Sequence, residues 1–319
     1  MGPSSAKLGE VRYRSIVADS ARWDGFQFRP DDIVISTPPK SGTTWTQMLC
    51  ALLIFDGPDF PASLEDITFW VDMQIRPIEV VHATYEAQQH RRFMKTHTPL
   101  DGLQLRDDVT YLVVGRDPRD AMVSMEHHMD NMIIERFIEL RAKAVGLDDL
   151  AEMGPRPAAS PDPAERFRHF IRADEPGGQG LTLASFLHHL DTAWQRRHEP
   201  NTAMFHYADY RADLPGELLR LATVLGIELS RARAVELAAE AGIERMRERA
   251  DEVVPNASSG QWKDVTSFLR AGATGEWRSR CTDDDLAEYE ARVAELVSPQ
   301  LAAWAHLGRI ASGVDPATA

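Results

Sequence analysis

Residues 32 to 45 read Asp-Ile-Val-Ile-Ser-Thr-Pro-Pro-Lys-Ser-Gly-Thr-Thr-Trp, and this stretch decides the fold. The short β-branched run at 32–36 predicts a buried strand, and the Pro- and Gly-containing run at 37–42 predicts a loop. Apolar residues at helical spacing follow, and either Thr43 or Thr44 can cap this helix. A strand, a loop and a helix in this order place backbone N–H groups and the positive end of the helix dipole around a small anion.

The loop is not a Walker A motif. That motif carries its Lys after the second of two glycines, whereas Lys40 precedes Gly42, the only glycine of this loop. The order of elements is therefore typical of phosphate binding, although the residue pattern differs.

Three more buried strands are expected, at residues 92–96, 110–114 and 203–207. Helical patterns are expected at residues 183–194, 214–225, 231–241 and 283–297. Strands separated by helices predict an α/β fold with a central parallel β-sheet flanked by helices. With the strand, loop and helix at 32–45, this pattern predicts a P-loop-like fold in a single domain that spans residues 1–319.

Pro and Gly punctuate the chain between Gly146 and Gly180. A loop of this length in a compact domain is usually either a lid over a site or a flexible insertion at the surface. The sequence leaves both alternatives open.

The composition, 43% hydrophobic and 26% charged over 319 residues, is typical of a globular chain. The 35 Lys and Arg residues are outnumbered by 49 Asp and Glu residues, which gives a net charge of −14. Such a surface repels the phosphates of a polynucleotide, so we expect no nucleic-acid partner. An anionic small ligand would require cations gathered at one place.

The sequence also predicts a location. Its longest apolar run, 48–55, has 8 residues, far fewer than the roughly 18 to 20 that a membrane-spanning helix needs. The polar N-terminal stretch lacks the apolar core of a secretory signal, so we expect a cytoplasmic protein. The two cysteines, Cys50 and Cys281, form neither a disulfide framework nor a four-ligand zinc site.

Four segments, in this order along the chain, resemble motifs of the cytosolic-type sulfotransferases. Residues 39–45 are similar to the family's 5′-phosphosulfate loop, and residues 95–100 to its catalytic K-T-H-x-P-L stretch. Residues 113–124 resemble its 3′-phosphate segment, and residues 268–277 its closing R-x-G-x-x-G-x-W loop. The overall sequence pattern is also similar to that of bacterial, mycobacterial-type glycolipid sulfotransferases. The resemblance implies that 3′-phosphoadenosine 5′-phosphosulfate (PAPS) is the co-substrate and 3′-phosphoadenosine 5′-phosphate (PAP) the product, without a metal.

The resemblance also implies which residues bind the nucleotide. Around the 5′-phosphate they are Lys40, Ser41, Gly42, Thr43 and Thr44. Around the 3′-phosphate they are Arg116, Ser124, Arg270 and Gly272. Trp45 resembles the aromatic residue that stacks on adenine, and Tyr207, at the end of the expected fourth strand, resembles the tyrosine near the adenosine.

Three residues are candidates for catalysis. His97 follows an expected strand, at the sheet edge where α/β proteins place their ligands, and we expect it to be the general base that removes the proton of an acceptor hydroxyl. Lys95 and Lys40 would stabilise charge on the transferring group and on the leaving oxygen. The pairs His127-His128 and His188-His189 are interpreted as non-catalytic.

Several residues depart from the family's pattern. Ala241, Gly242 and Ile243 stand where many members carry a hydroxyl and an aromatic group near adenine, and Ala271 stands where Lys is frequent. These changes predict a weaker affinity for the donor. No stretch before the closing loop resembles the family's dimerisation motif, so the sequence leaves the oligomeric state open.

Two other functions remain open. One is a P-loop-like kinase in which Asp117 holds Mg²⁺, although the loop lacks the Walker A pattern. The other is a non-catalytic nucleotide- or lipid-binding protein on the same fold. For a sulfotransferase, the expected acceptor is a small amphiphilic alcohol such as a glycolipid, or a phenol or steroid. Residues that could line an apolar acceptor pocket are Phe60, Phe69, Trp70, Met73 and Ile75, with Met122, Met125, Met129 and Met132.

Overall fold

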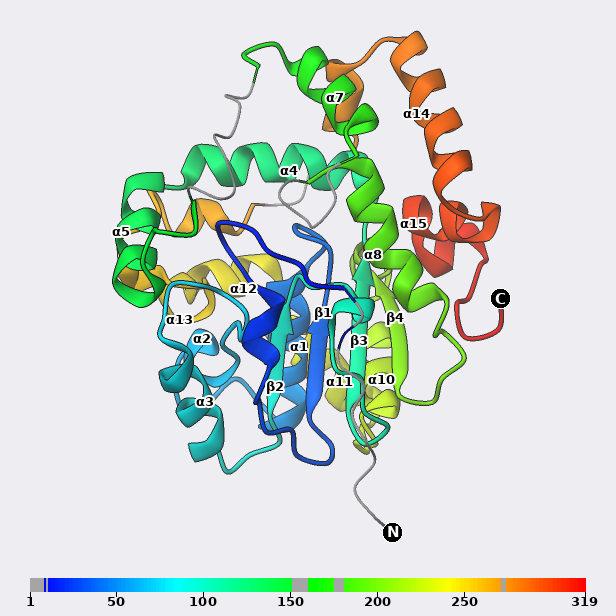
Figure 1. Cartoon of the computed structure of the whole chain (residues 1–319). Helices are drawn as coiled ribbons and strands as arrows, with labels where there is room; N and C mark the ends of the chain where they lie inside the picture. The colour runs from blue at the N-terminus through cyan, green and yellow to red at the C-terminus, as the bar shows by residue number, and fades with distance from the viewer. Residues whose placement is uncertain (1–8, 10, 151–159, 175–180, 271–273) are drawn as a thin grey trace.

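The computed structural model describes residues 9, 11–150, 160–174, 181–270 and 274–319 (Figure 1). Its centre is a parallel sheet in the order β2-β1-β3-β4. The strands are β1 (Ile33–Ser36), β2 (Phe93–Thr96), β3 (Thr110–Gly115) and β4 (Thr202–His206). The expected α/β fold with a central parallel sheet is therefore confirmed.

Helices cover both faces of this sheet (Figure 1). One face packs against α1 (Thr43–Ile54), α2 (Leu64–Ile67), α10 (Leu214–Val224), α11 (Arg231–Glu240), α12 (Ile243–Glu248) and α13 (Ala250–Val253). The other packs against α3 (Ile78–Ala87), α4 (Pro118–Asn131), α7 (Pro163–Arg172), α8 (Leu183–Trp194), α14 (Asp283–Leu296) and α15 (Pro299–Ser312). The side chains of β1 alternate between the two faces of the sheet. Ile33 and Ile35 face the first group of helices, and Val34 faces the second group.

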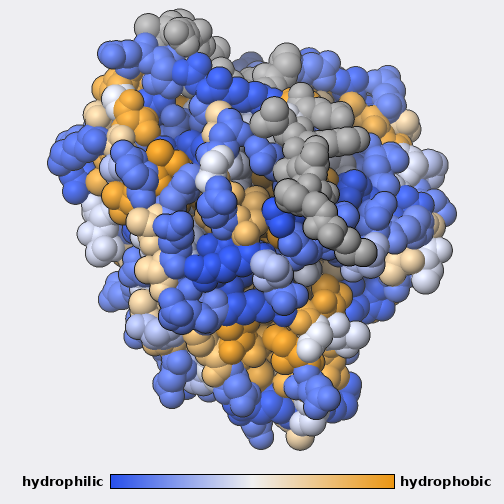
Figure 2. Space-filling model, turned by 60° about the horizontal axis from the view of Figure 1, so that its bottom comes forward, coloured by the Kyte–Doolittle hydropathy of each residue, from blue (hydrophilic) through white to orange (hydrophobic). Residues whose placement is uncertain are grey.

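The remaining helices connect these layers. They are α5 (Ile134–Val145) and α9 (Tyr207–Ala212), with the short 3₁₀ turns η1 (Ser20–Trp23), η2 (Leu100–Gly102), η3 (Ala257–Ser259), η4 (Thr266–Phe268) and η5 (Glu276–Arg280). Hydrophilic residues cover most of the face shown in Figure 2, and the apolar residues on that face form smaller areas between them. No helix among the described residues is both long and apolar enough to span a membrane.

Three expectations differ from the structure in detail. Helix α1 is capped by the backbone of Gly42, which has a φ of 100°, rather than by a threonine hydroxyl. The fourth strand ends at His206, so Tyr207 begins α9 instead of ending a strand. The segment expected to be a loop from 146 to 180 contains α7, which buries Phe167 in the core. The stretches 151–159 and 175–180 lie outside the described residues, and the lid stays a prediction.

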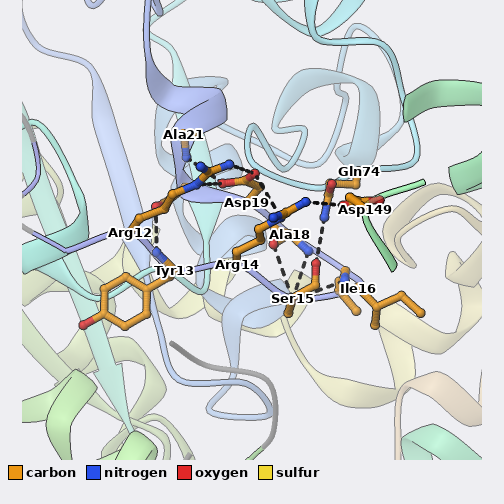
Figure 3. A network of polar contacts seen from close by, with 12 residues as sticks. Arg12, Tyr13, Arg14, Ser15, Ile16, Ala18, Asp19, Ala21, Gln74 and Asp149 are labelled. Atoms are coloured by element: carbon orange, nitrogen blue, oxygen red, sulfur yellow. Dashed lines mark hydrogen bonds and ion pairs between the residues drawn. The ribbon is translucent and has the colours of Figure 1, made fainter. Parts of the chain in front are cut away.

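The N-terminal segment is held against the loop that precedes α3 by a polar network (Figure 3). Arg14 Nη2 and Arg141 Nη2 both donate to Asp149 Oδ2, at 2.9 and 2.7 Å. Gln74 Nε2 donates to the Ser15 carbonyl at 2.8 Å, and its Oε1 accepts from Arg141. The network joins the first described residues to α5, although these elements lie far apart in the sequence.

A buried ion pair fixes the amino-terminal edge of the sheet. Asp32, before β1, accepts hydrogen bonds from Arg92, before β2, and both side chains are 2% exposed. Arg92 Nη2 also donates to the Gln27 carbonyl at 2.8 Å. The pair therefore sets the two neighbouring strands in register from the edge opposite Gly42.

Loss of this pair is expected to destabilise the fold. Arg92→Met leaves the Asp32 carboxylate buried without its cation, and breaking such a pair costs about 3–5 kcal/mol. Urea denaturation measures the free energy of unfolding. The matched control is Arg106→Met, which removes a cation from a pair with Asp108 that is more than a third exposed and should cost less than about 1 kcal/mol. Equal losses in the two variants would contradict the assignment of a structural role to Arg92.

Candidate active site

The carboxyl ends of the four parallel strands meet at one edge of the sheet, where α/β folds place their ligand sites. Thr37 follows β1, His97 follows β2 and Arg116 follows β3. Ser36 pairs in register with Thr96 on one side and with Val113 on the other, so these three ends are neighbours. The structure thus brings together residues that lie up to 79 positions apart in the sequence.

The loop after β1 presents backbone donors at the start of α1. The first amides of a helix have no acceptor within it, and they carry the positive end of the dipole. Lys40 and Gly42 both adopt positive φ angles, of 67° and 100°. A side chain at position 42 would lie 3.1 Å from the Tyr207 ring, so glycine also allows this close approach. The Thr43 and Thr37 hydroxyls lie 2.6 Å apart and tie the loop to the strand end.

Two aromatic side chains lie next to the ammonium of Lys40. Its Nζ is 3.3 Å from His128 Nδ1 and 4.8 Å from the centre of the Phe268 ring. Burial, together with the positive charges of Arg116, Lys95 and Arg270, lowers the pKa of Lys40 from 10.5 to about 7. Any anion that enters the loop would offset this repulsion.

The hydrogen bond of His97 fixes which ring nitrogen is free. Nδ1 lies 2.7 Å from the Thr37 carbonyl, which can only accept, so Nδ1 carries the proton and Nε2 carries the lone pair. The Trp70 ring meets the imidazole edge to face at 4.6 Å. Burial lowers the pKa of His97 from 6.5 to about 3, opposed by the bond to Thr37 and assisted by Lys95 and Lys40.

Lys95 lies two residues before His97 on β2 and is 8% exposed. Its Nζ is 5.6 Å from the centre of the Trp70 ring. Burial lowers its pKa from 10.5 to about 8, while the carboxylates of Glu65 and Asp72 favour the charged form. A second ammonium is therefore available close to the imidazole.

Arg116 connects the loop to an aromatic group. Its Nη1 donates to the Lys40 carbonyl at 2.9 Å, and its guanidinium lies 4.4 Å from the centre of the Tyr207 ring. Trp45 meets Tyr207 edge to face at 5.5 Å. The buried Arg116 Nε and Ser41 Oγ have no hydrogen-bond partner within the described ranges. These unpaired donors, the loop amides and the nearby cations fit a phosphorylated nucleotide that supplies acceptor oxygens.

Two further expected ligands of the 3′-phosphate, Ser124 and Arg270, belong to the described residues. Ser124 is half-buried on α4. Arg270 Nη2 donates to Glu276 Oε1 at 2.7 Å, so its guanidinium is paired in the structure without ligand. Gly272 and Ala271 lie outside the described residues. A cavity of about 160 Å³ next to Arg116 is lined by residues after β3 and β4 and by the closing segment, including Asp117, Asp120, Tyr207 and Gly275.

Comparison with known proteins decides the family. The family described as "Sulfotransferase domain" matches residues 30–300. The chain is 50% identical to a glycolipid sulfotransferase of Mycobacterium bovis, over 96% of this chain and 97% of that protein. It is 49% identical to the glycolipid sulfotransferase Rv1373 of Mycobacterium tuberculosis, with the same coverage. This chain belongs to the sulfotransferase family.

Solved structures of low sequence identity share the fold. A retinol dehydratase in complex with androsterone and inactive cofactor PAP superposes with a TM-score of 0.67 at 22% identity, over 88% of this chain and 87% of that one. Mouse sulfotransferase SULT7A1 complexed with PAP gives a TM-score of 0.63 at 19% identity, over 88% of each chain. The expectation of a PAPS-dependent sulfotransferase is confirmed, in preference to a kinase or a non-catalytic binding protein.

Three residues contact the candidate catalytic side chains in ways that the sequence did not predict. His128 was interpreted as non-catalytic because it is one of a pair on a helix, yet it contacts Lys40. The sequence indicates Phe268 only as the first residue of the closing motif, yet its ring lies against the Lys40 ammonium. Trp70 was considered only for an acceptor pocket, and it also contacts His97. A signal was available for Trp70 alone, through its place in the aromatic stretch before α3.

The sulfotransferase should keep His97 neutral far below the usual pH of imidazole titration. Burial disfavours the charged ring, so its pKa is lowered and the neutral form with Nδ1 protonated should persist between pH 5 and 8. Nitrogen-15 NMR of the ring, assigned by comparison with His97→Asn, measures both the tautomer and the midpoint. A midpoint near 6.5, or a proton on Nε2, would contradict this geometry.

Proposed function

We propose that this sulfotransferase moves the sulfuryl group of PAPS to a hydroxyl of an amphiphilic glycolipid, with His97 as general base. The observation that carries the proposal is the bond between His97 Nδ1 and the Thr37 carbonyl. It leaves Nε2 as a proton acceptor at the sheet edge, within the field of two lysines. A neutral imidazole in this tautomer is suited to proton removal from an alcohol.

The proposed chemistry is an in-line displacement at sulfur. PAPS supplies the sulfuryl group when it is bound. His97 Nε2 accepts the hydroxyl proton while the acceptor oxygen bonds to sulfur, and the bond from sulfur to the bridging phosphate oxygen breaks. Lys40 neutralises the charge that develops on this leaving oxygen, and Lys95 stabilises the transferring group. PAP leaves with the electron pair of the broken bond.

Two sets of residues would hold the nucleotide. Lys40, Ser41 and the amides of Gly42, Thr43 and Thr44 would bind the 5′-phosphate, supported by the helix terminus and by the unpaired Ser41 hydroxyl. Arg116, Ser124, Arg270 and Gly272 would bind the 3′-phosphate, for which Arg270 exchanges or shares its present partner Glu276. Trp45 and Tyr207 would contact the adenosine, supported by their mutual edge-to-face packing.

An apolar cluster supports an acceptor with a lipid portion. Met73, Ile75 and Phe137 form a separate buried group, against which Trp70 packs. Because Trp70 also contacts His97, this cluster is continuous with the proposed base. The other partly buried members are Ile16, Val17, Met132, Ile138 and Leu140. Relatives that are about 50% identical are named glycolipid sulfotransferases, which gives independent support for a glycolipid rather than a phenol or steroid.

We also infer that the enzyme works in the cytoplasm on small molecules alone. Cys50 and Cys281 are both free thiols, which is typical of reducing compartments. The net charge of −14 disfavours a polynucleotide partner. Fractionation of the native host tests the location.

Loss of His97 should separate catalysis from binding. With sulfur-35-labelled PAPS, a mycobacterial-type glycolipid and a chelator, the wild type should transfer sulfate. His97→Ala should lower turnover by about 10²- to 10⁴-fold, because it removes the base. Calorimetry should find the affinity for PAP unchanged, because the imidazole is not proposed to hold the nucleotide.

The matched control is His198→Ala, which removes an exposed histidine that precedes β4, at the opposite edge of the sheet. It should keep full turnover. A His97→Ala enzyme with near-normal turnover would refute the mechanism. Transfer to a phenol or steroid in preference to the glycolipid would refute the acceptor class and leave the mechanism standing.

A further inference from the structure

A buried carboxylate lies directly behind His97. Asp72 is fully buried, on the segment that precedes α3, and its Oδ2 accepts two hydroxyl hydrogen bonds. The donors are the Oγ1 atoms of Thr96 and Thr98, each at 2.6 Å. These two threonines are the residues on either side of His97. One oxygen atom therefore anchors both neighbours of the imidazole.

The two threonines form a closed turn around His97. The Thr98 amide donates to Thr96 Oγ1 at 2.8 Å, so the backbone folds back over a single residue. The Ser36 hydroxyl donates to the Thr98 carbonyl at 2.7 Å and fastens the turn to β1. With both flanking residues held, the His97 ring has a defined direction, in which Nδ1 meets the Thr37 carbonyl. The position of Nε2 thus depends on the Asp72 anchor.

The segment that carries the carboxylate is held by contacts to the N-terminal segment as well as by the Trp70–Lys95 bridge to β2. The Asp72 carbonyl accepts from the Asp19 amide at 2.9 Å, and the Gln74 amide donates to the Val17 carbonyl at 2.9 Å. The next residue, Met73, pairs with Ala18 in an antiparallel bridge. The polar network of Figure 3 fastens Gln74 and the N-terminal segment to α5. A rigid frame allows one carboxylate to impose a position on the turn.

Stability alone does not explain this carboxylate. Burial raises the pKa of Asp72, because desolvation disfavours its charge, and the hydrogen bonds that favour the charged form, those of the two threonines foremost, only partly oppose this. It forms no ion pair within the described ranges, and its Oδ1 has no hydrogen-bond partner there. The charges of Lys95 and Arg22 compensate a buried carboxylate without an ion-pair partner only in part, so apolar residues at 72, 96 and 98 would pack at lower cost. A role in placing a reactive group accounts for its presence.

We propose that Asp72 is a positioning residue, which acts through Thr96 and Thr98 to aim His97 Nε2 at the acceptor hydroxyl. This inference rests on the proposed function of His97 as general base. It goes beyond that function because it assigns a task to a side chain that touches neither the nucleotide nor the acceptor. Its loss should affect proton transfer and leave nucleotide binding intact.

A double-mutant cycle with His97 tests the proposal. Asp72→Asn keeps the shape and removes the charge, and we expect kcat to fall about 10- to 100-fold, as for a small misplacement of a reacting group. The affinity for PAP should stay unchanged. In a His97→Ala background, where there is no imidazole left to aim, the same substitution should change the residual rate by less than about twofold. A purely structural role would lower the rate by the same factor in both backgrounds.

The matched control is Asp285→Asn on α14. Asp285 is also a buried aspartate that accepts a threonine hydroxyl, from Thr282 at 2.8 Å, and its helix α14 lies well apart from β2 in Figure 1. It should leave kcat unchanged in both backgrounds. If Asp72→Asn fails to fold, Thr98→Val takes its place in the cycle, because it removes one of the two anchoring hydroxyls and should lower kcat only when His97 is present.

The outcomes distinguish a failure of the general-base role of His97 from a failure of the positioning role of Asp72. Near-normal turnover of His97→Ala alone would refute the general base, and with it the role of Asp72. A large loss in His97→Ala, combined with full activity of Asp72→Asn or with equal losses in both backgrounds, would refute only the positioning role. Coupling between the two residues with unchanged PAP affinity would support it.

Discussion

Repulsion between like charges at the carboxyl edge of the sheet is the constraint on which the site depends. The parallel strands end together, and the loops after them carry cations into one small region of a chain whose net charge is −14. The four cationic residues are Lys40, Lys95, Arg116 and Arg270, and the last three all lower the pKa of Lys40. Within the protein this repulsion is relieved only in part, by the aromatic side chain against Lys40 and by the pair between Arg270 and Glu276. The edge is therefore prepared for a polyanion, and the sulfotransferase family to which the chain belongs uses one.

The same charges keep the proposed base neutral, although a lowered pKa also makes the imidazole a weaker proton acceptor. Lys95 and Lys40 oppose protonation of His97, and burial opposes it more strongly. The imidazole therefore stays neutral at the pH at which a base is needed, and the Thr37 carbonyl selects the tautomer that leaves Nε2 free. Lys40 and Lys95 thus act both in donor binding and in keeping the base neutral. The carboxylates of Glu65 and Asp72 partly oppose the effect of burial on Lys95, because they favour its ammonium form.

Much of the fold could be predicted from sequence because its signals are local. Buried parallel strands appear as short β-branched runs, and the loop before α1 carries its own turn residues, so the four strands and α1 lie close to where the pattern put them. Predictions from the sequence failed where the three-dimensional surroundings decide the local structure. The backbone of Gly42 caps α1, although two threonines follow it, because its positive φ turns the chain into the helix. Residues of α7 pack into the core although prolines and glycines surround them. No local signal shows that His128 faces Lys40, since only the crossing of α4 over the loop brings the two together.

The central claim concerns the charge of Lys40, and the proton balance of PAP binding tests it most directly. Burial and the neighbouring cations lower the pKa of Lys40 to about 7, so part of the amine is neutral near pH 7.5, and an anion beside it should raise that pKa. Calorimetry in two buffers of different ionisation enthalpy measures the protons taken up. We predict that the wild type takes up more protons on binding PAP than Lys40→Met does, because the other ionisable groups of protein and nucleotide are common to both. Equal proton uptake by the two proteins would contradict the account.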